Sequence, residues 1–252
     1  MKKTTADVGL NRTGIQTSPI ISKEAIQGAL EGLPSSEGSE EGILEVRAEY
    51  ARESGGLGTV PVPATFKGML STAKELFKGT KPTVFIDKLG ERLGFERTGV
   101  RLYEAALCKY DVHGTWEGGP SRVQLEKIRS DELAHFALLR EAIETLGADP
   151  TALTPSADLV AVVSKGIPEV LVDPRTNLVQ CLEALMVAEL ADNAGWELLI
   201  ELAEGLGQSE LAEQFDQALM VEAEHLELVR RWLSAAVLGE ARVPEEASVP
   251  AP

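Results

Sequence analysis

Apolar side chains recur every three or four residues along four long stretches in the second two-thirds of the chain. This spacing places the apolar side chains on one face of an α-helix, and it therefore predicts four long helices. Ser121 and Ser209 are expected N-caps, and glycines close to the other ends mark where the pattern stops. The predicted helices cover residues 84–111, 121–145, 177–205 and 209–238.

Helices of this size, roughly 25–30 residues and about 40 Å long, are expected to pack alongside one another. The short connections within the first pair and within the second pair favour two antiparallel hairpins. The connection between the pairs, residues 147–176, is long enough to cross the length of a bundle, and it includes an expected short helix near 155–165. The predicted fold is therefore all-α: a four-helix bundle over residues 84–239 with one long crossover.

The N-terminal third of the chain has a different composition. Residues 1–60 contain a segment rich in Ser, Gly and Glu and another rich in Gly and Pro, with one helix candidate at 22–33. We expect an N-terminal arm that is partly extended or disordered, because such a composition buries little apolar surface. Residues 61–83 include an amphipathic stretch, 66–79, which predicts a short helix that packs on the bundle. The Pro-containing end, 240–252, is expected to be a flexible tail.

Charged residues interrupt the apolar faces of the second and fourth predicted helices. The chain has three histidines, and two of them stand in one motif: DELAH contains Glu132-x-x-His135, and EAEH contains Glu222-x-x-His225. Residues three apart share a helix face, so each pair can direct a carboxylate and an imidazole to one point. Such a pair is a natural half-site for a first-row transition metal.

The residues around these motifs are expected to be core positions, and a carboxylate among them is costly unless it is paired or bound to a metal. The alternative is a plain helical bundle whose interior polar groups satisfy one another. The expected core positions are Leu125, Ile128, Phe136 and Leu139 on the second helix and Met220, Leu226, Val229 and Leu233 on the fourth.

A site for two metal ions in such a bundle also needs one carboxylate from each of the other two helices. The candidates are Glu91, Glu96 and Glu104 on the first predicted helix and Glu183, Glu189, Glu197 and Glu201 on the third. Their distance from the two motifs distinguishes them: Glu96 lies 36 residues before Glu132, and Glu189 lies 33 residues before Glu222. The two halves of the bundle therefore match as a degenerate repeat.

An aromatic residue strengthens this match. Tyr103 follows Glu96 by seven positions, and Trp196 follows the second glutamate, Glu189, by the same number. Neither Glu104 nor Glu183 fits these relations, so neither is predicted to be a ligand.

The segments FERTGVRLY, SDELAH, AELADNAGW and VEAEH resemble the four helices of the ferritin-like di-iron carboxylate superfamily, and most closely those of its rubrerythrin and bacterioferritin branches. The resemblance implies six metal ligands, two of which, Glu132 and Glu222, bridge the ions. The other four complete the two ends of the site as pairs: Glu96 with His135, and Glu189 with His225.

This resemblance implies two metal ions, with iron as the expected metal and manganese as the alternative, because carboxylates and imidazoles suit both. The implied activity is of the ferroxidase or peroxidase type, with dioxygen or hydrogen peroxide as the oxidant and an unidentified electron donor. Three further roles are hypotheses: Tyr103 hydrogen-bonds a ligand carboxylate, Asp131 orients a ligand histidine, and Asp192 serves as an extra or alternate ligand.

Charge and cysteine content narrow the function further. The net charge is −16, and residues 84–252 carry 30 acidic and 14 basic side chains, a balance that excludes nucleic acid as a partner and attracts cations. Cys108 and Cys181 form no C-x-x-C pair, which excludes a rubredoxin domain, and both are expected to be small core residues. The absence of a long apolar run and of a secretory signal predicts a cytoplasmic protein that binds no membrane.

Two classes of function remain open. The first is a redox enzyme, expected as a homo-oligomer and most simply as a dimer. The second is a metal-binding cargo or scaffold protein whose N-terminal arm docks on a partner or on a neighbouring subunit. GLNRTGIQTSPI, residues 9–20, resembles a docking segment.

Overall fold

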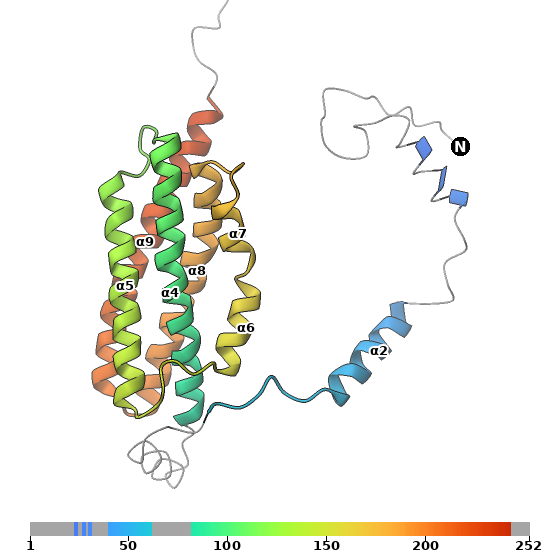
Figure 1. Ribbon diagram of the computed structural model, residues 1–252, viewed down its shortest axis with the longest axis vertical. Helices are drawn as coiled ribbons and strands as arrows, with labels where there is room; N and C mark the ends of the chain where they lie inside the picture. The colour runs from blue at the N-terminus through green and yellow to red at the C-terminus, as the bar shows by residue number, and fades with distance from the viewer. Residues whose placement is uncertain (1–22, 25–26, 29, 32–39, 62–81, 243–252) are drawn as a thin grey trace, which may run out of the picture. The chain divides into compact units, whose positions relative to one another are not determined.

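The computed structural model describes residues 23–24, 27–28, 30–31, 40–61 and 82–242. The chain divides into two compact units, Met1–Gly56 and Leu57–Pro252. Within the described ranges all regular secondary structure is helical (Figure 1), which confirms an all-α fold. None of the described helices is both long and apolar enough to cross a membrane.

The first unit contains helix α2, Glu40–Glu53. The described residues of the candidate at 22–33 are helical as predicted, but α2 is a helix that the sequence analysis misses. It has no buried residue among those described, so the apolar stripe from which a helix is recognised is weak here. The docking segment 9–20, the predicted helix at 66–79 and the end of the tail lie outside the described residues.

Four long helices build the second unit. They are α4 (Pro82–His113), α5 (Arg122–Thr145), α8 (Leu178–Gly205) and α9 (Ser209–Glu240). They lie side by side, with α4 packed on α5 and α8, and with α9 packed on α8 and α5 (Figure 1). Each helix begins and ends within two residues of the predicted bounds.

The helix starts follow from local chemistry. Ser121 caps α5 as predicted, in a capping box with Gln124, and Asn177 caps α8 in the same way. The prediction for Ser209 is wrong: it is the first residue of α9, and the residue before it, Gln208, caps the helix without a side-chain hydrogen bond.

The crossover from α5 to α8 contains two short helices rather than the one predicted, α6 (Pro155–Val163) and α7 (Gly166–Val172). Helix α6 packs on α4, and α7 packs on α8 and α4. Thr154 caps α6, and its hydroxyl also donates to the backbone carbonyl of Asp87, 3.1 Å away on α4. This contact fixes the crossover against the first hairpin.

The buried apolar residues form two clusters along the four long helices. One includes Leu125, Leu182 and Trp232, and the other includes Leu139, Trp196 and Phe215. On α5, α8 and α9 the two clusters occupy different turns, and the predicted ligands lie in the turns between them; on α4 the clusters meet at Leu93 and Phe95, beside Glu96. A layer of charged side chains therefore crosses the bundle between two apolar layers.

Two expected core residues are exposed. Met220 is 57% exposed, because it lies two residues before Glu222 and hence about 200° around α9 from that inward-facing carboxylate. Cys108 is also exposed, whereas Cys181 is buried as predicted. The other seven expected core residues are buried or partly buried.

Candidate metal centre

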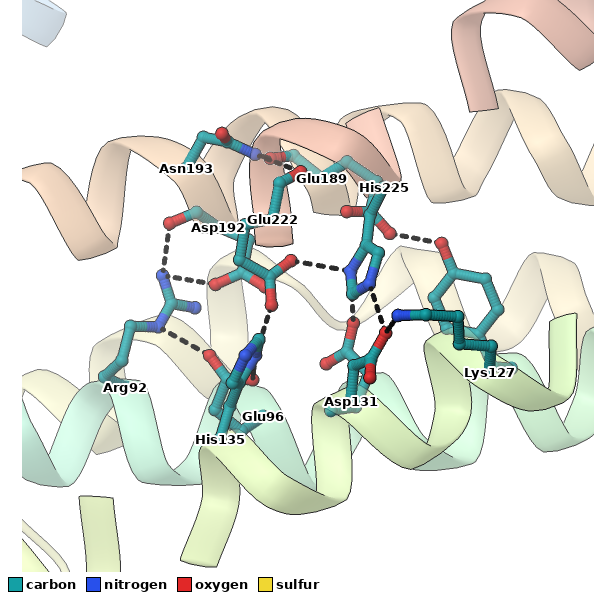
Figure 2. Close-up of polar contacts among 12 residues, drawn as sticks. Arg92, Glu96, Lys127, Asp131, His135, Glu189, Asp192, Asn193, Glu222 and His225 are labelled. Carbon is teal, nitrogen blue, oxygen red and sulfur yellow. Dashed lines mark hydrogen bonds and ion pairs between the residues drawn. The ribbon is translucent and has the colours of Figure 1, made fainter. Parts of the chain in front are cut away.

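The charged layer brings all six predicted ligands together. Every one of them is at most 7% exposed, and the side chains converge from all four long helices (Figure 2). Helices α4 and α8 supply one glutamate each, whereas α5 and α9 supply a glutamate and a histidine each. The six residues are Glu96, Glu132, His135, Glu189, Glu222 and His225.

These residues form overlapping groups whose ligand atoms lie within 4.8 Å of one another. One group is Glu132, Glu189, Glu222 and His225, and a second is Glu96, His135 and Glu222. A third contains Asp192 together with Glu96, Glu132 and Glu222. Glu222 belongs to all three groups, and Glu96 and Glu132 belong to two each.

Several carboxylate oxygens in this layer are buried without a hydrogen-bond partner among the described residues. They include both oxygens of Glu96 and the Oε2 atoms of Glu132 and Glu189. A buried carboxylate left unpaired carries a large desolvation cost, which bound cations would offset. The donor set, carboxylates with two imidazoles, is the one that iron and manganese accept. The residues therefore fit a metal centre.

His225 is held at one end of the site, which we call the His225 end and which includes Glu189. Its Nδ1 lies 3.0 Å from Glu222 Oε2, and its Nε2 lies 3.1 Å from Asp131 Oδ2. Lys127 Nζ is 2.6 Å from the same oxygen of Asp131. Asp131 thus contacts a ligand histidine, as hypothesised, and leaves Nδ1 as the nitrogen that faces the carboxylates.

His135 lies at the other end, which we call the His135 end and which includes Glu96. Its Nδ1 is 2.5 Å from Glu222 Oε1 and 3.8 Å from Glu96 Oε2. The edge of the imidazole packs on Trp196, with ring centroids 5.5 Å apart. Glu222 therefore reaches one histidine with each of its two oxygens.

The two aromatic residues of the sequence repeat have different contacts. The Tyr103 hydroxyl, which is fully buried, donates to Glu189 Oε1, so this tyrosine hydrogen-bonds a predicted ligand. Burial and the neighbouring Glu189 raise the pKa of Tyr103 well above its ordinary value, which keeps its proton in place. Trp196 instead packs on His135, and its Nε1 has no hydrogen-bond partner among the described residues.

Burial controls the protonation of most of these carboxyls. It raises the pKa of Glu189 to about 8 and that of Asp192 to about 7, and it raises the pKa of Glu96 and Glu132 well above the usual range. Glu222 is the exception. Burial would raise its pKa too, but the hydrogen bonds from the two histidines outweigh it and lower the pKa to about 2.

Sequence reasoning misses two polar residues of the site. Arg92 is 5% exposed and lies 3.1 Å from Asp192 Oδ1 and 3.6 Å from Glu96 Oε1. Asn193 Nδ2 donates to the backbone carbonyls of Glu189 and Glu222, at 2.9 and 3.1 Å, and so joins α8 to α9 beside the ligands. Arginine and asparagine are mostly surface residues, and no motif marks either of these as part of the site.

A glycine on α4 makes room for one ligand. A Cβ atom at Gly99 would lie 1.9 Å from Glu132 Oε2, whereas a Cβ at Gly94, on the same helix, would meet nothing within 4 Å. Gly99→Ala is therefore expected to displace the Glu132 carboxylate and to weaken metal binding about tenfold or more, the loss of roughly one good ligand contact.

Titration of metal-free protein with Mn²⁺ checks this expectation, and Gly94→Ala is its matched control. The control should bind Mn²⁺ as the wild type does and gain up to about 1 kcal/mol of stability from the higher helix propensity of alanine. Unchanged affinity in Gly99→Ala would contradict the placement of Glu132 in the site.

Comparison of the chain with protein-family models, with curated proteins and with solved structures found no match.

Proposed function

We propose that this chain is a ferritin-like di-metal carboxylate protein with redox activity of the ferroxidase or peroxidase type, acting with dioxygen or hydrogen peroxide. The observation that carries the proposal is the pair of ligand groups that share Glu132 and Glu222 in a buried layer with unpaired carboxylate oxygens. In a bundle that bound no metal, this layer of buried carboxyls would only cost folding free energy.

The arrangement of the helices supports the same proposal. In ferritin-like carboxylate proteins two helices each supply a glutamate, and the other two each supply Glu-x-x-His from the bundle interior. Here α4 and α8 supply Glu96 and Glu189, and the two motifs lie on α5 and α9. Two hairpins joined by a long crossover agree with this fold as well.

Bound iron or manganese would supply electrons to the oxidant, one from each ion. Neighbouring side chains orient the residues that would bind the metal. Asp131 accepts from Nε2 of His225, so that Nδ1 presents its lone pair to the site once the imidazole is neutral. The Tyr103 hydroxyl donates a hydrogen bond to Glu189 Oε1 and orients that carboxylate. The two apolar clusters on either side exclude bulk water.

Anaerobic loading of the full chain with Fe²⁺, followed by exposure to dioxygen or to hydrogen peroxide, tests the function. We expect about two iron ions per chain and oxidation at least about tenfold faster than that of Fe²⁺ in buffer, a modest catalytic effect. Bound iron that oxidises no faster than free iron with either oxidant would reject the redox proposal. If deletion of residues 1–60 then also reduced the oligomeric mass, the cargo or scaffold function would be favoured instead.

A further inference from the structure

The two ends of the candidate metal centre differ in charge, and the difference lies in Arg92. At the His225 end the polar neighbours are Tyr103, Asn193 and Asp131, and the cation paired with Asp131, Lys127, is exposed. At the His135 end a buried guanidinium stands between two carboxylates, Glu96 and Asp192 (Figure 2). A permanent positive charge thus sits beside residues that would have to bind a cation.

Arg92 is fixed in this place by several contacts. Its Nη1 donates to the backbone carbonyls of Ala191 and Asp192, at 3.4 and 3.2 Å, and the Cζ atom lies 4.1 Å from the centroid of the Phe95 ring. Gly195 provides the space, because a Cβ atom there would lie 1.8 Å from Nη1. The guanidinium therefore occupies a slot that α8 leaves open, and it cannot swing out to solvent as a surface arginine would.

We propose that Arg92 is a resident cation of the site, which competes with the second metal ion for Glu96 and Asp192 and makes the two ions bind with unequal affinity. The inference rests on the proposed di-metal function. Repulsion between a guanidinium and a divalent ion a few ångströms apart, even at an effective dielectric constant of about 20, exceeds the energy of a tenfold change in affinity. The His225 end should fill first and the His135 end second.

Equilibrium dialysis of the metal-free full-length protein against Mn²⁺ tests the proposal. Electron paramagnetic resonance measures the free ion. The wild type should bind two ions, the second at least about tenfold more weakly than the first. Arg92→Gln frees Asp192 and removes the positive charge, so it should raise the second affinity about tenfold while it lowers the melting temperature of the metal-free protein.

Two matched variants separate charge from structure. Arg92→Lys keeps the charge and should keep the gap between the two affinities. Arg97→Gln removes the same charge from an exposed position on the same helix and should leave both affinities unchanged. A purely structural role for Arg92 predicts that Arg92→Gln lowers stability and metal affinity together, and that result, or an unchanged gap, would overturn the proposal.

The wild type alone provides a second test, which does not depend on the folding of any variant. In crystals grown with one equivalent of Mn²⁺, the anomalous signal should lie between Glu189 and His225. A signal at the His135 end, or equal signals at both ends, would reject the inequality but leave the di-metal proposal standing. Failure of the wild type to bind Mn²⁺ or Fe²⁺ at all would reject both.

Discussion

The double replacement of Glu132 and Glu222 by alanine is expected to abolish metal binding without unfolding the metal-free protein. Glu222 belongs to all three ligand groups and Glu132 to two of them, and the loss of both leaves each end with one carboxylate and one histidine from the predicted set. Two ligands hold a first-row ion far more weakly than four. The metal-free fold should survive, because both apolar clusters stay intact and the loss of the costly buried carboxyl of Glu132 offsets part of what the two histidines lose with Glu222.

Elemental analysis after expression in medium supplemented with iron and manganese measures the result, and far-ultraviolet circular dichroism checks the fold. The matched control is Glu104→Ala combined with Glu224→Ala, which removes two exposed carboxylates from the same bundle. The control should retain about two ions per chain, whereas the first variant should retain none. Full metal content in the Glu132 and Glu222 variant would show that the ions bind elsewhere.

The metal-free protein is expected to lose thermal stability as the pH rises from about 5 to about 8. Burial raises the pKa of Glu189 to about 8 and that of Asp192 to about 7. A carboxyl whose pKa is higher in the folded state stabilises the fold while it is protonated, and that contribution disappears as the pH rises through the folded-state pKa. His225, despite its burial, has a pKa raised to about 10 by its carboxylate partners, and it acts in the same direction above about pH 6.5. Glu222 acts oppositely, but only below its ordinary pKa of 4.5.

Metal should reverse this dependence, because ligands must release their protons to bind it. At a free Mn²⁺ concentration about 1,000 times each dissociation constant, two ions stabilise the fold by about 8 kcal/mol, which corresponds to a rise in melting temperature of about 15–30 °C. The gain should be larger at pH 8 than at pH 5.5. Calorimetric melts at both pH values, with Mn²⁺ or with a chelator, measure it. If the melting temperature of the metal-free protein rose across this pH range, the result would contradict the raised pKa values of the buried carboxyls.

The buried cluster of candidate ligands was predictable because the residue types and their spacing are rare. Histidine occurs three times in the chain, and two of the three share one motif, so the motif stands out even among abundant glutamates. Glu96 and Glu189 followed from the repeat, because equal hairpins place equivalent turns at the same level of the bundle. The structure places both of them, and the shared residues, in one buried layer.

What the sequence did not reveal depends on contacts between helices. Arg92 and Gly195 lie about 100 positions apart, and only the packing of α4 on α8 shows that one fills the space left by the other. In the sequence, Gly99 is only a residue of low helix propensity. The structure shows that the missing Cβ makes room for the Glu132 carboxylate. The prediction for Met220 is wrong for another reason: an apolar residue close to a motif can still face solvent, because its angle around the helix decides its burial.

The ligand groups also bear on how the protein folds. Each group takes residues from both hairpins: one joins α5 to α8 and α9, and another joins α4 and α5 to α9. Neither hairpin alone offers a complete binding site, so an ion gains its ligands only after the hairpins have docked. Metal bound so late stabilises the native state more than the transition state, and it therefore slows unfolding without accelerating folding. On the proposed function, the chain first collapses around an acidic layer that lacks its cations, and the bound ions would then mainly slow unfolding.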